Sequence, residues 1–228
     1  MRKFLLWDHD GVLVDTERWF FIATQECLRE LGVELDQVTY LQYMAAGRSC
    51  WDLALDHGQS DVVIAAQRRE RDRRYQSYLA TKDIAIDGVL ETLHTLCHQY
   101  RMAIVSTSTR SDMALIHRAR GILPFFEFVL TLEDYAQPKP APDPYLKALH
   151  RFGAVAREAV AIEDSSRGLR AAMAAGLDCV VVCNAFTASQ DFSGAWRMLH
   201  AIRELPGTLA GAPRLAGDGD DALLHHRA

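Results

Sequence analysis

The sequence predicts an α/β protein, with a Rossmann-like parallel sheet core into which an α-helical cap domain is inserted. Two observations support this fold class. Short apolar runs alternate with amphipathic segments of helical period, which is typical of strands that are buried on both faces and separated by helices. The stretch from 15 to 83 interrupts this alternation, because it carries helical patterns and no strand pattern.

Each expected element follows from its local pattern. The expected strands are the apolar runs at 4–7, 102–106, 126–131, 159–163 and 179–183, and the expected core helices are the amphipathic segments at 88–98, 109–119, 142–152 and 165–175. In the insertion, a helix after Thr16 is closed by Gly32, and two or three further helical segments follow.

These elements divide the chain into three parts. We expect a catalytic core at 1–14 and 84–205 and a helical cap at 15–83. The tail at 206–228 is rich in Gly, Ala and charge, so we expect it to be mobile or loosely docked.

Composition limits the function classes. The 228 residues are 49% hydrophobic, enough for a substantial core, and the net charge of −5 gives no general attraction for nucleic acid. The five scattered cysteines are typical of reduced thiols, and no stretch approaches the roughly 20 apolar residues of a membrane helix. We therefore expect a cytoplasmic protein without nucleic-acid or membrane partners, whose oligomeric state the sequence leaves open.

Two acids follow the first expected strand. Asp8 ends that strand, and Asp10 can face the same pocket because residues i and i+2 of an extended segment point the same way. Carboxylates this close need a cation or a shared proton, which suits acid/base chemistry around a divalent metal. The alternative is that Asp8 caps a turn and Asp10 is solvated.

The ends of other strands add groups that could bind an anion and a metal. Ser106 ends the second strand, and the N–H groups of Thr107 and Ser108 precede a helix, which makes an anion site or a simple N-cap. Glu163 and Asp164 end the fourth strand, where one acid could cap the next helix. An acid pair also suits Mg²⁺, which prefers oxygen ligands.

Lys139 lies in the segment QPKPAPDP, where the flanking prolines hold the backbone extended. A lysine fixed in this way can serve as a placed cation, although most lysines are solvated surface charges. Because ligands bind beyond the carboxyl ends of the strands in an open parallel sheet, all these groups could meet at one site.

In this order, the motifs resemble those of the haloacid dehalogenase-like superfamily. The first motif is WDHDGVLVDT, the second IVSTS, the third KPAPDPY and the fourth AIEDSSRGLRAAMAAG, and the resemblance covers nearly everything before Pro206. The insertion resembles the small α-helical cap of the group that includes phosphoglycolate phosphatase and β-phosphoglucomutase.

The resemblance implies a Mg²⁺-dependent phosphatase that hydrolyses a small phosphorylated metabolite through an aspartyl phosphate. It implies Asp8 as nucleophile, Asp10 as acid/base, phosphate binding by Ser106, Thr107 and Lys139, and a metal held by Asp8, the backbone carbonyl of Asp10 and Asp164, with Glu163 close or bridging through water. In the cap, Gly47, Arg48 and Arg71 are candidates for substrate specificity.

Other functions stay open. A mutase of the β-phosphoglucomutase type shares all four motifs, but Phe20 and Cys50 stand where such mutases carry a His and an Arg. We therefore favour hydrolysis of a sugar phosphate or phosphoglycolate. A dehalogenase lacks the second Asp, and a phospho-receiver module would be shorter and have no cap. His9 departs from the usual apolar residue, and its ring either acts near the nucleophile or projects away from the pocket.

Overall fold

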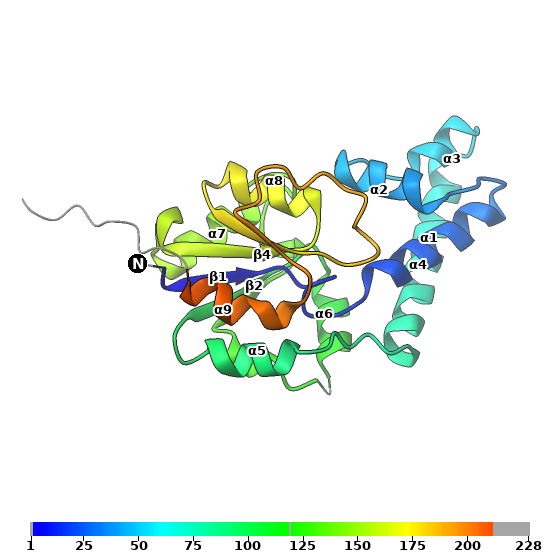
Figure 1. The fold of residues 1–228 in the computed structure, drawn as a ribbon. Helices are drawn as coiled ribbons and strands as arrows, with labels where there is room; N and C mark the ends of the chain where they lie inside the picture. The colour runs from blue at the N-terminus through cyan, green and yellow to red at the C-terminus, as the bar shows by residue number, and fades with distance from the viewer. Residues whose placement is uncertain (1, 119, 212–228) are drawn as a thin grey trace, which may run out of the picture.

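The centre of the molecule is a parallel β-sheet, as predicted (Figure 1). Within residues 2–118 and 120–211, which this computed structural model describes, the sheet has six strands in the order β3-β2-β1-β4-β5-β6. The strands are β1 (Phe4–Trp7), β2 (Arg101–Val105), β3 (Phe128–Leu130), β4 (Ala159–Glu163), β5 (Asp178–Val182) and β6 (Arg197–Leu199). All neighbouring strands pair in parallel, and β1 lies between β2 and β4.

Helices cover both faces of the sheet. They are α5 (Val89–Leu96), α6 (Arg110–His117), α7 (Asp143–Phe152), α8 (Ser166–Ala174) and α9 (Leu205–Ala210), with short 3-10 helices at Leu123–Phe125, Leu132–Asp134, Ala156–Glu158 and Ile202–Glu204. Helices α7 and α8 pack on one face against Leu6 and Ala161, and α5, α6 and α9 pack on the other against Leu5 and Ile162. The alternation of β1 between the two cores explains why its whole length is apolar.

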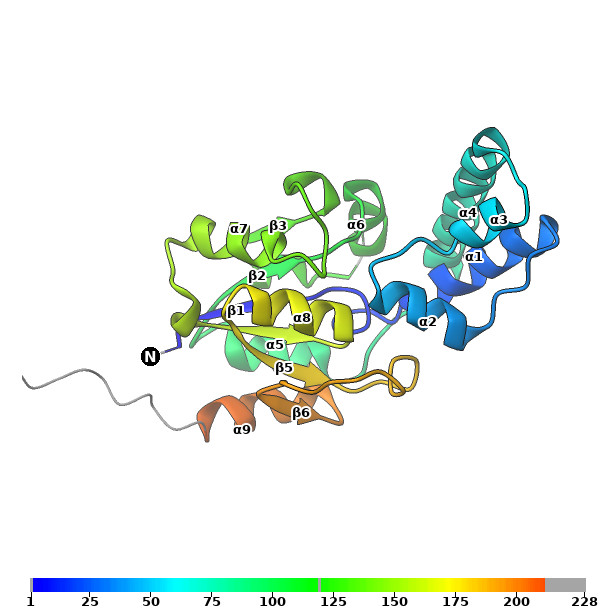
Figure 2. The same cartoon turned by 90° about the horizontal axis from the view of Figure 1, so that it is seen from above.

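Residues 15–83, here named the cap segment, contain helices α1 (Glu17–Glu30), α2 (Gln37–Ala45), α3 (Asp52–Asp56) and α4 (Asp61–Thr81). They lie beyond one end of the sheet (Figures 1 and 2). Three of these helices bury Leu28, Leu41 and Ile64 in one apolar cluster with Trp51. Helix α1 ends just before Gly32, whose φ of +77° lets the chain reverse.

The two connections between the cap segment and the sheet run side by side. Val14 forms an antiparallel bridge with Ala85, and the Asp15 N–H donates to the Ile84 carbonyl at 3.0 Å. Val14 and Ile84 are buried, so this crossing is packed as well as hydrogen-bonded.

The sequence missed two features at the C-terminal side. Strand β6 has only Leu199 buried, so it lacks the continuous apolar run that marks the other strands. The expected tail boundary at Pro206 is wrong for residues 206–210, because α9 includes them and Leu209 is buried against the core. The rest of the expected tail, residues 212–228, lies outside the described residues.

Two further sequence expectations concern thiols and membranes. All five cysteines lie within the described ranges, and none of them forms a disulfide. Among the residues with described positions, no helix is long and apolar enough to cross a membrane.

Candidate active site

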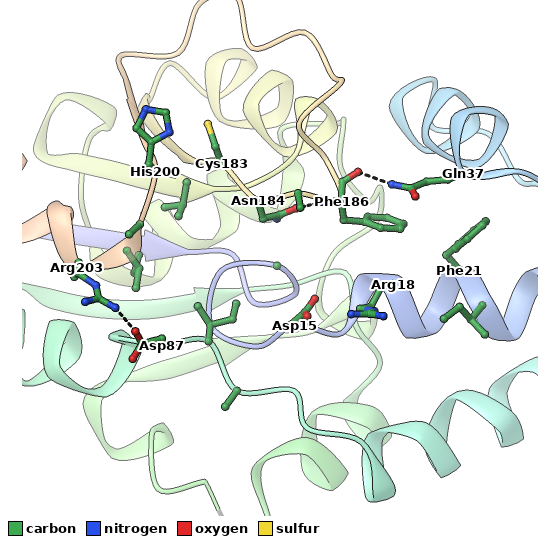
Figure 3. Close-up of a pocket in the computed structure, with 18 residues that line it drawn as sticks. Asp15, Arg18, Phe21, Gln37, Asp87, Cys183, Asn184, Phe186, His200 and Arg203 are labelled. Carbon is green, nitrogen blue, oxygen red and sulfur yellow. Dashed lines mark hydrogen bonds and ion pairs between the residues drawn. The ribbon is translucent and has the colours of Figure 1, made fainter.

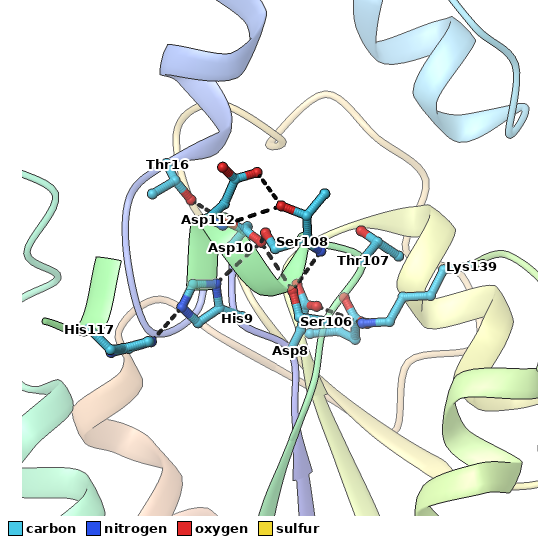
Figure 4. Close-up of polar contacts among 12 residues, drawn as sticks. Asp8, His9, Asp10, Thr16, Ser106, Thr107, Ser108, Asp112, His117 and Lys139 are labelled. Carbon is cyan, nitrogen blue, oxygen red and sulfur yellow. Dashed lines mark hydrogen bonds and ion pairs between the residues drawn. The ribbon is translucent and has the colours of Figure 1, made fainter. Parts of the chain in front are cut away.

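The predicted residues of the four motifs meet where β1, β2 and β4 end, and Figure 4 shows those of the first three motifs. Asp8 follows β1, Ser106 follows β2, and Glu163 and Asp164 stand at the end of β4, while Lys139 comes from the segment before α7. These five side chains are all at least nine-tenths buried by residue exposure. Charged groups are buried at this level when they are paired, and Lys139 is paired with Asp8 and with Glu163.

Lys139 joins two of the acids. Its Nζ donates to Asp8 Oδ1 at 2.6 Å and to Glu163 Oε1 at 2.6 Å. Burial would lower the pKa of Lys139, but the two carboxylates raise it above its usual range, so the ammonium stays charged. Burial and the charge of Glu163 raise the pKa of Asp8 to about 7, against the opposite effect of Lys139.

Asp10 has a separate set of partners, although it is only one residue from His9 and two from Asp8. Ser108 Oγ donates to Asp10 Oδ2 at 2.6 Å, Ser106 Oγ lies 3.3 Å from the same oxygen, and Thr16 donates to Oδ1. Burial would raise the pKa of Asp10, but the neighbouring His9 ring and these hydroxyls hold it below its usual range. The two acids therefore have different partners: Asp8 pairs with a lysine, and Asp10 accepts hydrogen bonds from hydroxyl groups.

Three carboxylates could hold a divalent metal ion. Asp8, Glu163 and Asp164 each offer a ligand oxygen, and these oxygens lie within 4.8 Å of one another. Burial and the charges of Asp8 and Glu163 raise the pKa of Asp164, a repulsion that a bound cation would relieve. Gly11 makes room for this arrangement, because a Cβ built there would lie 2.0 Å from Asp164 Oδ2. An all-oxygen donor set with this charge fits a hard divalent cation.

Glu163, one of the expected metal residues, has contacts that sequence reasoning did not foresee. Glu163 Oε1 accepts from Tyr145 at 2.5 Å as well as from Lys139, so this carboxylate also anchors the lysine. Gly168 leaves it the space, because a Cβ there would meet the Glu163 carboxylate at 2.0 Å. The side chain of Asp10 does not belong to the acidic group, so the expected contribution of this residue is limited to its backbone carbonyl.

The expected phosphate-binding loop is preformed. Ser106 Oγ accepts from the Ser108 N–H at 2.9 Å, and Thr109 caps α6 by accepting from the Asp112 N–H at 3.2 Å. Thr107 is half-buried, and its Oγ1 accepts from Arg167 Nη2 at 3.4 Å. The loop thus presents a hydroxyl and a helix N-terminus at the same place, as the sequence indicated.

A cavity of about 580 Å³ lies between the cap segment and the core residues Leu132, Pro138 and Arg167. Its lining includes the arginines Arg48, Arg68, Arg71 and Arg167, and the neutral residues Phe20, Cys50 and Pro138. Arg71 lies 4.3 Å over the ring of Phe20, with its Nε 2.7 Å from Asp72 Oδ1. Gly47 touches the core, since a Cβ on it would lie 3.1 Å from Pro140 Cδ. Of the expected specificity residues, Gly47 therefore lies beside Pro140, and Arg48 and Arg71 line the cavity that Pro138 also lines.

A second cavity, of about 610 Å³, lies on another face of α1 (Figure 3). Asp15, Arg18 and Phe21 line it from the cap side, and Asn184 and His200 line it from the sheet. Arg203 and Asp87 form an ion pair at its edge. Of the first motif it contains Gly11 and Asp15, and it contains none of the candidate nucleophile, acid/base, phosphate-binding or metal-binding residues.

Sequence reasoning missed four supporting residues. Tyr145 holds Glu163, Asn184 Nδ2 donates to Asp164 Oδ2 at 2.8 Å, and Thr187 Oγ1 donates to the Asp164 carbonyl at 2.8 Å. Arg167 reaches the cap cavity from the start of α8. Asn184 could have been predicted from the sequence, because it follows the carboxyl end of a strand, β5, as the catalytic candidates do.

His9 is fully buried, and its ring does not simply project away from the site. Its Nδ1 lies 3.3 Å from Asp10 Oδ2, and its Nε2 lies 2.8 Å from Nε2 of His117. The ring therefore contacts one of the candidate catalytic acids.

Comparison with known proteins gives a consistent result. The model of the family described as haloacid dehalogenase-like hydrolase matches residues 5–182. Protein CbbY of Rhodobacter capsulatus is 33% identical over an alignment that covers 90% of this chain and 99% of that protein. The fructose-1-phosphate phosphatase YqaB of Escherichia coli is 30% identical, over 78% of this chain and 95% of that protein. A solved structure of a CbbY mutant from Rhodobacter sphaeroides, in complex with xylulose 1,5-bisphosphate, matches with a TM-score of 0.75 at 26% identity, covering 90% of this chain and 96% of that one.

Proposed function

The chain belongs to the haloacid dehalogenase-like hydrolase family, and we propose that it is a Mg²⁺-dependent phosphatase acting through an aspartyl phosphate on Asp8. The observation that carries the proposal is the placement of the two acids. Asp8 lies against a buried, charged lysine and the acidic group, and Asp10 is held two residues away by hydroxyls. This arrangement supports Asp8 as the nucleophile and Asp10 as the group that moves a proton.

In the proposed reaction, Asp8 attacks phosphorus and the ester oxygen leaves. Asp10 gives a proton to that oxygen and then takes one from the water that hydrolyses the aspartyl phosphate. Lys139, Ser106 and the N-terminus of α6, with Thr107 beside it, neutralise the phosphoryl oxygens as negative charge develops.

The metal would be held by Asp8, Asp164 and the Asp10 carbonyl, with Glu163 at the edge of the site. Mg²⁺, when bound, supplies positive charge that offsets the phosphoryl oxygens and the crowded carboxylates. The donor set of this chain supports the assignment, because three buried carboxylates prefer a hard cation.

We propose a sugar phosphate as the substrate, ahead of phosphoglycolate. The cavity between cap and core has four arginines on its lining, and their charge suits a polyhydroxylated substrate with a further anionic group. The names of relatives support a sugar: one is a fructose-1-phosphate phosphatase, and a related structure contains xylulose 1,5-bisphosphate.

We also propose that the chain divides into a core at 1–14 and 84–205 and a cap at 15–83, with the cap as the specificity element. The separate apolar cluster of the cap helices and the paired connections at Val14 and Ala85 support this division. A cytoplasmic location, where phosphorylated sugars occur, is part of the same proposal.

The test is phosphate release from a panel of sugar phosphates and phosphoglycolate, with Mg²⁺ and with excess chelator. We expect release only with Mg²⁺ and with intact Asp8, so Asp8→Asn should lose essentially all turnover because its amide cannot attack phosphorus. Asp56→Asn, an exposed change in α3, is the matched control and should retain full activity. Unchanged turnover by a folded Asp8→Asn protein, or in chelator, would contradict the mechanism.

A further inference from the structure

A buried pair of histidines lies behind the candidate acid/base. His9 is on the turn after β1 and is 0% exposed, and His117 ends α6 and is 8% exposed. Their Nε2 atoms are 2.8 Å apart, although 108 positions separate them in the chain. Figure 4 shows the His9 ring between Asp10 and His117, with an interaction on each side.

The distance between the two nitrogens constrains both rings. At 2.8 Å the two Nε2 atoms can share only one hydrogen, so one ring donates and the other accepts. This bond fixes the orientation of the His9 ring and leaves its other nitrogen, Nδ1, 3.3 Å from Asp10 Oδ2. The ring is thus held from one side by His117 and faces Asp10 with the other.

The other contacts of Asp10 are of a different kind. Ser106, Ser108 and Thr16 reach it with hydroxyls, which rotate to follow a carboxylate. The imidazole of His9 is a rigid plane that cannot follow. Burying two imidazoles also costs more free energy than filling the same space with apolar side chains, and the Nδ1 atoms of His9 and His117 are both left without a hydrogen-bond partner among the described residues. The 3.3 Å approach of His9 Nδ1 to Asp10 Oδ2 is therefore a close polar contact and not a hydrogen bond. An arrangement of this cost is not explained by packing.

We propose that His9 and His117 are positioning residues for Asp10: His117 fixes the His9 ring, and that ring holds the Asp10 carboxylate toward the leaving oxygen. The inference rests on the proposed phosphatase reaction and names residues that the motifs of the family do not include. Neither histidine touches the substrate, and no proton leaves the pair during turnover.

The consequence is specific to one chemical step. Positioning of the acid matters when the leaving oxygen needs a proton, as for an alkyl ester such as fructose 1-phosphate. It matters little for p-nitrophenyl phosphate, whose leaving group departs without this help. A loss of positioning therefore lowers kcat for the first substrate selectively and leaves KM for both unchanged.

The variants are made at His117, which is farther from the reacting atoms. His117→Leu removes the bond to His9 while filling the space, and His117→Gln retains a side chain that can donate and accept. Met113→Leu, buried one turn earlier on α6, is the control for repacking of that helix. We expect His117→Leu to lower kcat for fructose 1-phosphate by about tenfold and for p-nitrophenyl phosphate by less than about twofold. His117→Gln should recover most of the loss, and Met113→Leu should show none.

A double-mutant comparison decides whether the effect passes through Asp10. In the Asp10→Asn background, His117→Leu should have no further effect on either substrate, because the acid it positions is already gone. Equal losses for the two substrates, or the same loss in both backgrounds, would overturn the positioning role while leaving the phosphatase intact. A wild-type protein that turns over neither substrate nor any member of the panel would overturn the proposed function and the positioning role together.

Discussion

Two carboxylates that stand one residue apart in the chain have different environments. Alternation along an extended segment predicted that Asp8 and Asp10 would share a pocket, but it could not predict what would separate them. The partners that do so, Lys139 and Ser108, are remote in sequence and are brought together only by the strand order. Burial and the charge of Glu163 raise the pKa of Asp8 in spite of Lys139. The His9 ring and the hydroxyls lower the pKa of Asp10 in spite of burial.

Replacement of Asp10 by asparagine tests its role as an acid. We expect Asp10→Asn to lower kcat for alkyl phosphates by about a hundredfold or more, because proton transfer to a poor leaving group contributes at least this much. An activated aryl phosphate should lose much less. Rates across a series of leaving groups of increasing pKa provide the measurement, and a uniform reduction along the series would exclude Asp10 from leaving-group protonation.

At the scale of helices and strands, the sequence predicted the elements that have a clear apolar or amphipathic pattern and missed those that bury few apolar residues. Five strands and four core helices could be predicted because runs such as AVAIE are buried on both faces and helices such as α6 begin at capping residues. Strand β6 and helix α9 were missed because each buries only one or two apolar residues. The supporting contacts of Tyr145 and Arg167 could not be predicted, since no local pattern specifies which distant group a polar side chain will meet.

We expect the paired connections near Val14 and Ala85 to act as the hinge of the cap segment. A cap that closes over substrate bends at its connections, so their amides should exchange more slowly when closure is stabilised. We expect slower hydrogen exchange at 14–16 and 81–87 with Mg²⁺ and a phosphate analogue such as vanadate. Amides of α7, which lies on the sheet, serve as the internal control. Unchanged exchange at both connections, with binding confirmed by calorimetry, would indicate a site that stays open.

The cap elements also bear on the choice between hydrolysis and isomerisation. Phe20 packs edge-on against Tyr75 with Arg71 over its ring, and Cys50 is buried in the cap cluster. Neither Phe20 nor Cys50 can donate hydrogen bonds comparable to those of a His and an Arg, which would hold a sugar bisphosphate while it reorients in the site.

We therefore expect free phosphate to accumulate faster than isomer when β-glucose 1-phosphate is supplied with catalytic glucose 1,6-bisphosphate. Glucose 6-phosphate and phosphate are followed in the same sample by coupled assays, with the Asp8→Asn protein as the blank. Glucose 6-phosphate forming much faster than phosphate would assign the chain to the mutases and leave the four motifs in place.

For the whole molecule, the buried acids link stability to pH and metal. Burial raises the pKa of Asp8 to about 7, so the folded state binds its proton more tightly than the unfolded chain, and stability falls as pH rises toward and through 7. His117 has the opposite effect on stability. Burial lowers its pKa to about 4, so its contribution makes the folded state more stable as the pH rises from about 4 to about 6.5. The pKa of Asp10 is lowered, so its contribution changes only in more acidic solution.

We expect the protein without metal to lose a few degrees of melting temperature between pH 6.5 and 8, and Mg²⁺ to raise it more at pH 8 than at pH 6.5. Protons and metal compete for the same carboxylates, which sets the direction of this difference. Scanning calorimetry with and without Mg²⁺ measures it, and Asp8→Asn should flatten the pH dependence. A Mg²⁺ effect that is larger at pH 6.5 would show that another group controls the stability.

The central place of β1 also sets an order of events during synthesis. Phe4 aligns with Arg101 in β2 and with Ala159 in β4, so the first strand made has no partner until the whole cap segment and β2 have been made, and it lacks its second partner until β4 follows. The cap helices, by contrast, are contiguous and pack on one another, which makes them the part that can form early. A growing chain therefore carries a folded helical unit beside an unpaired FLLW segment, and completion of the sheet is the slow, aggregation-sensitive stage of its folding.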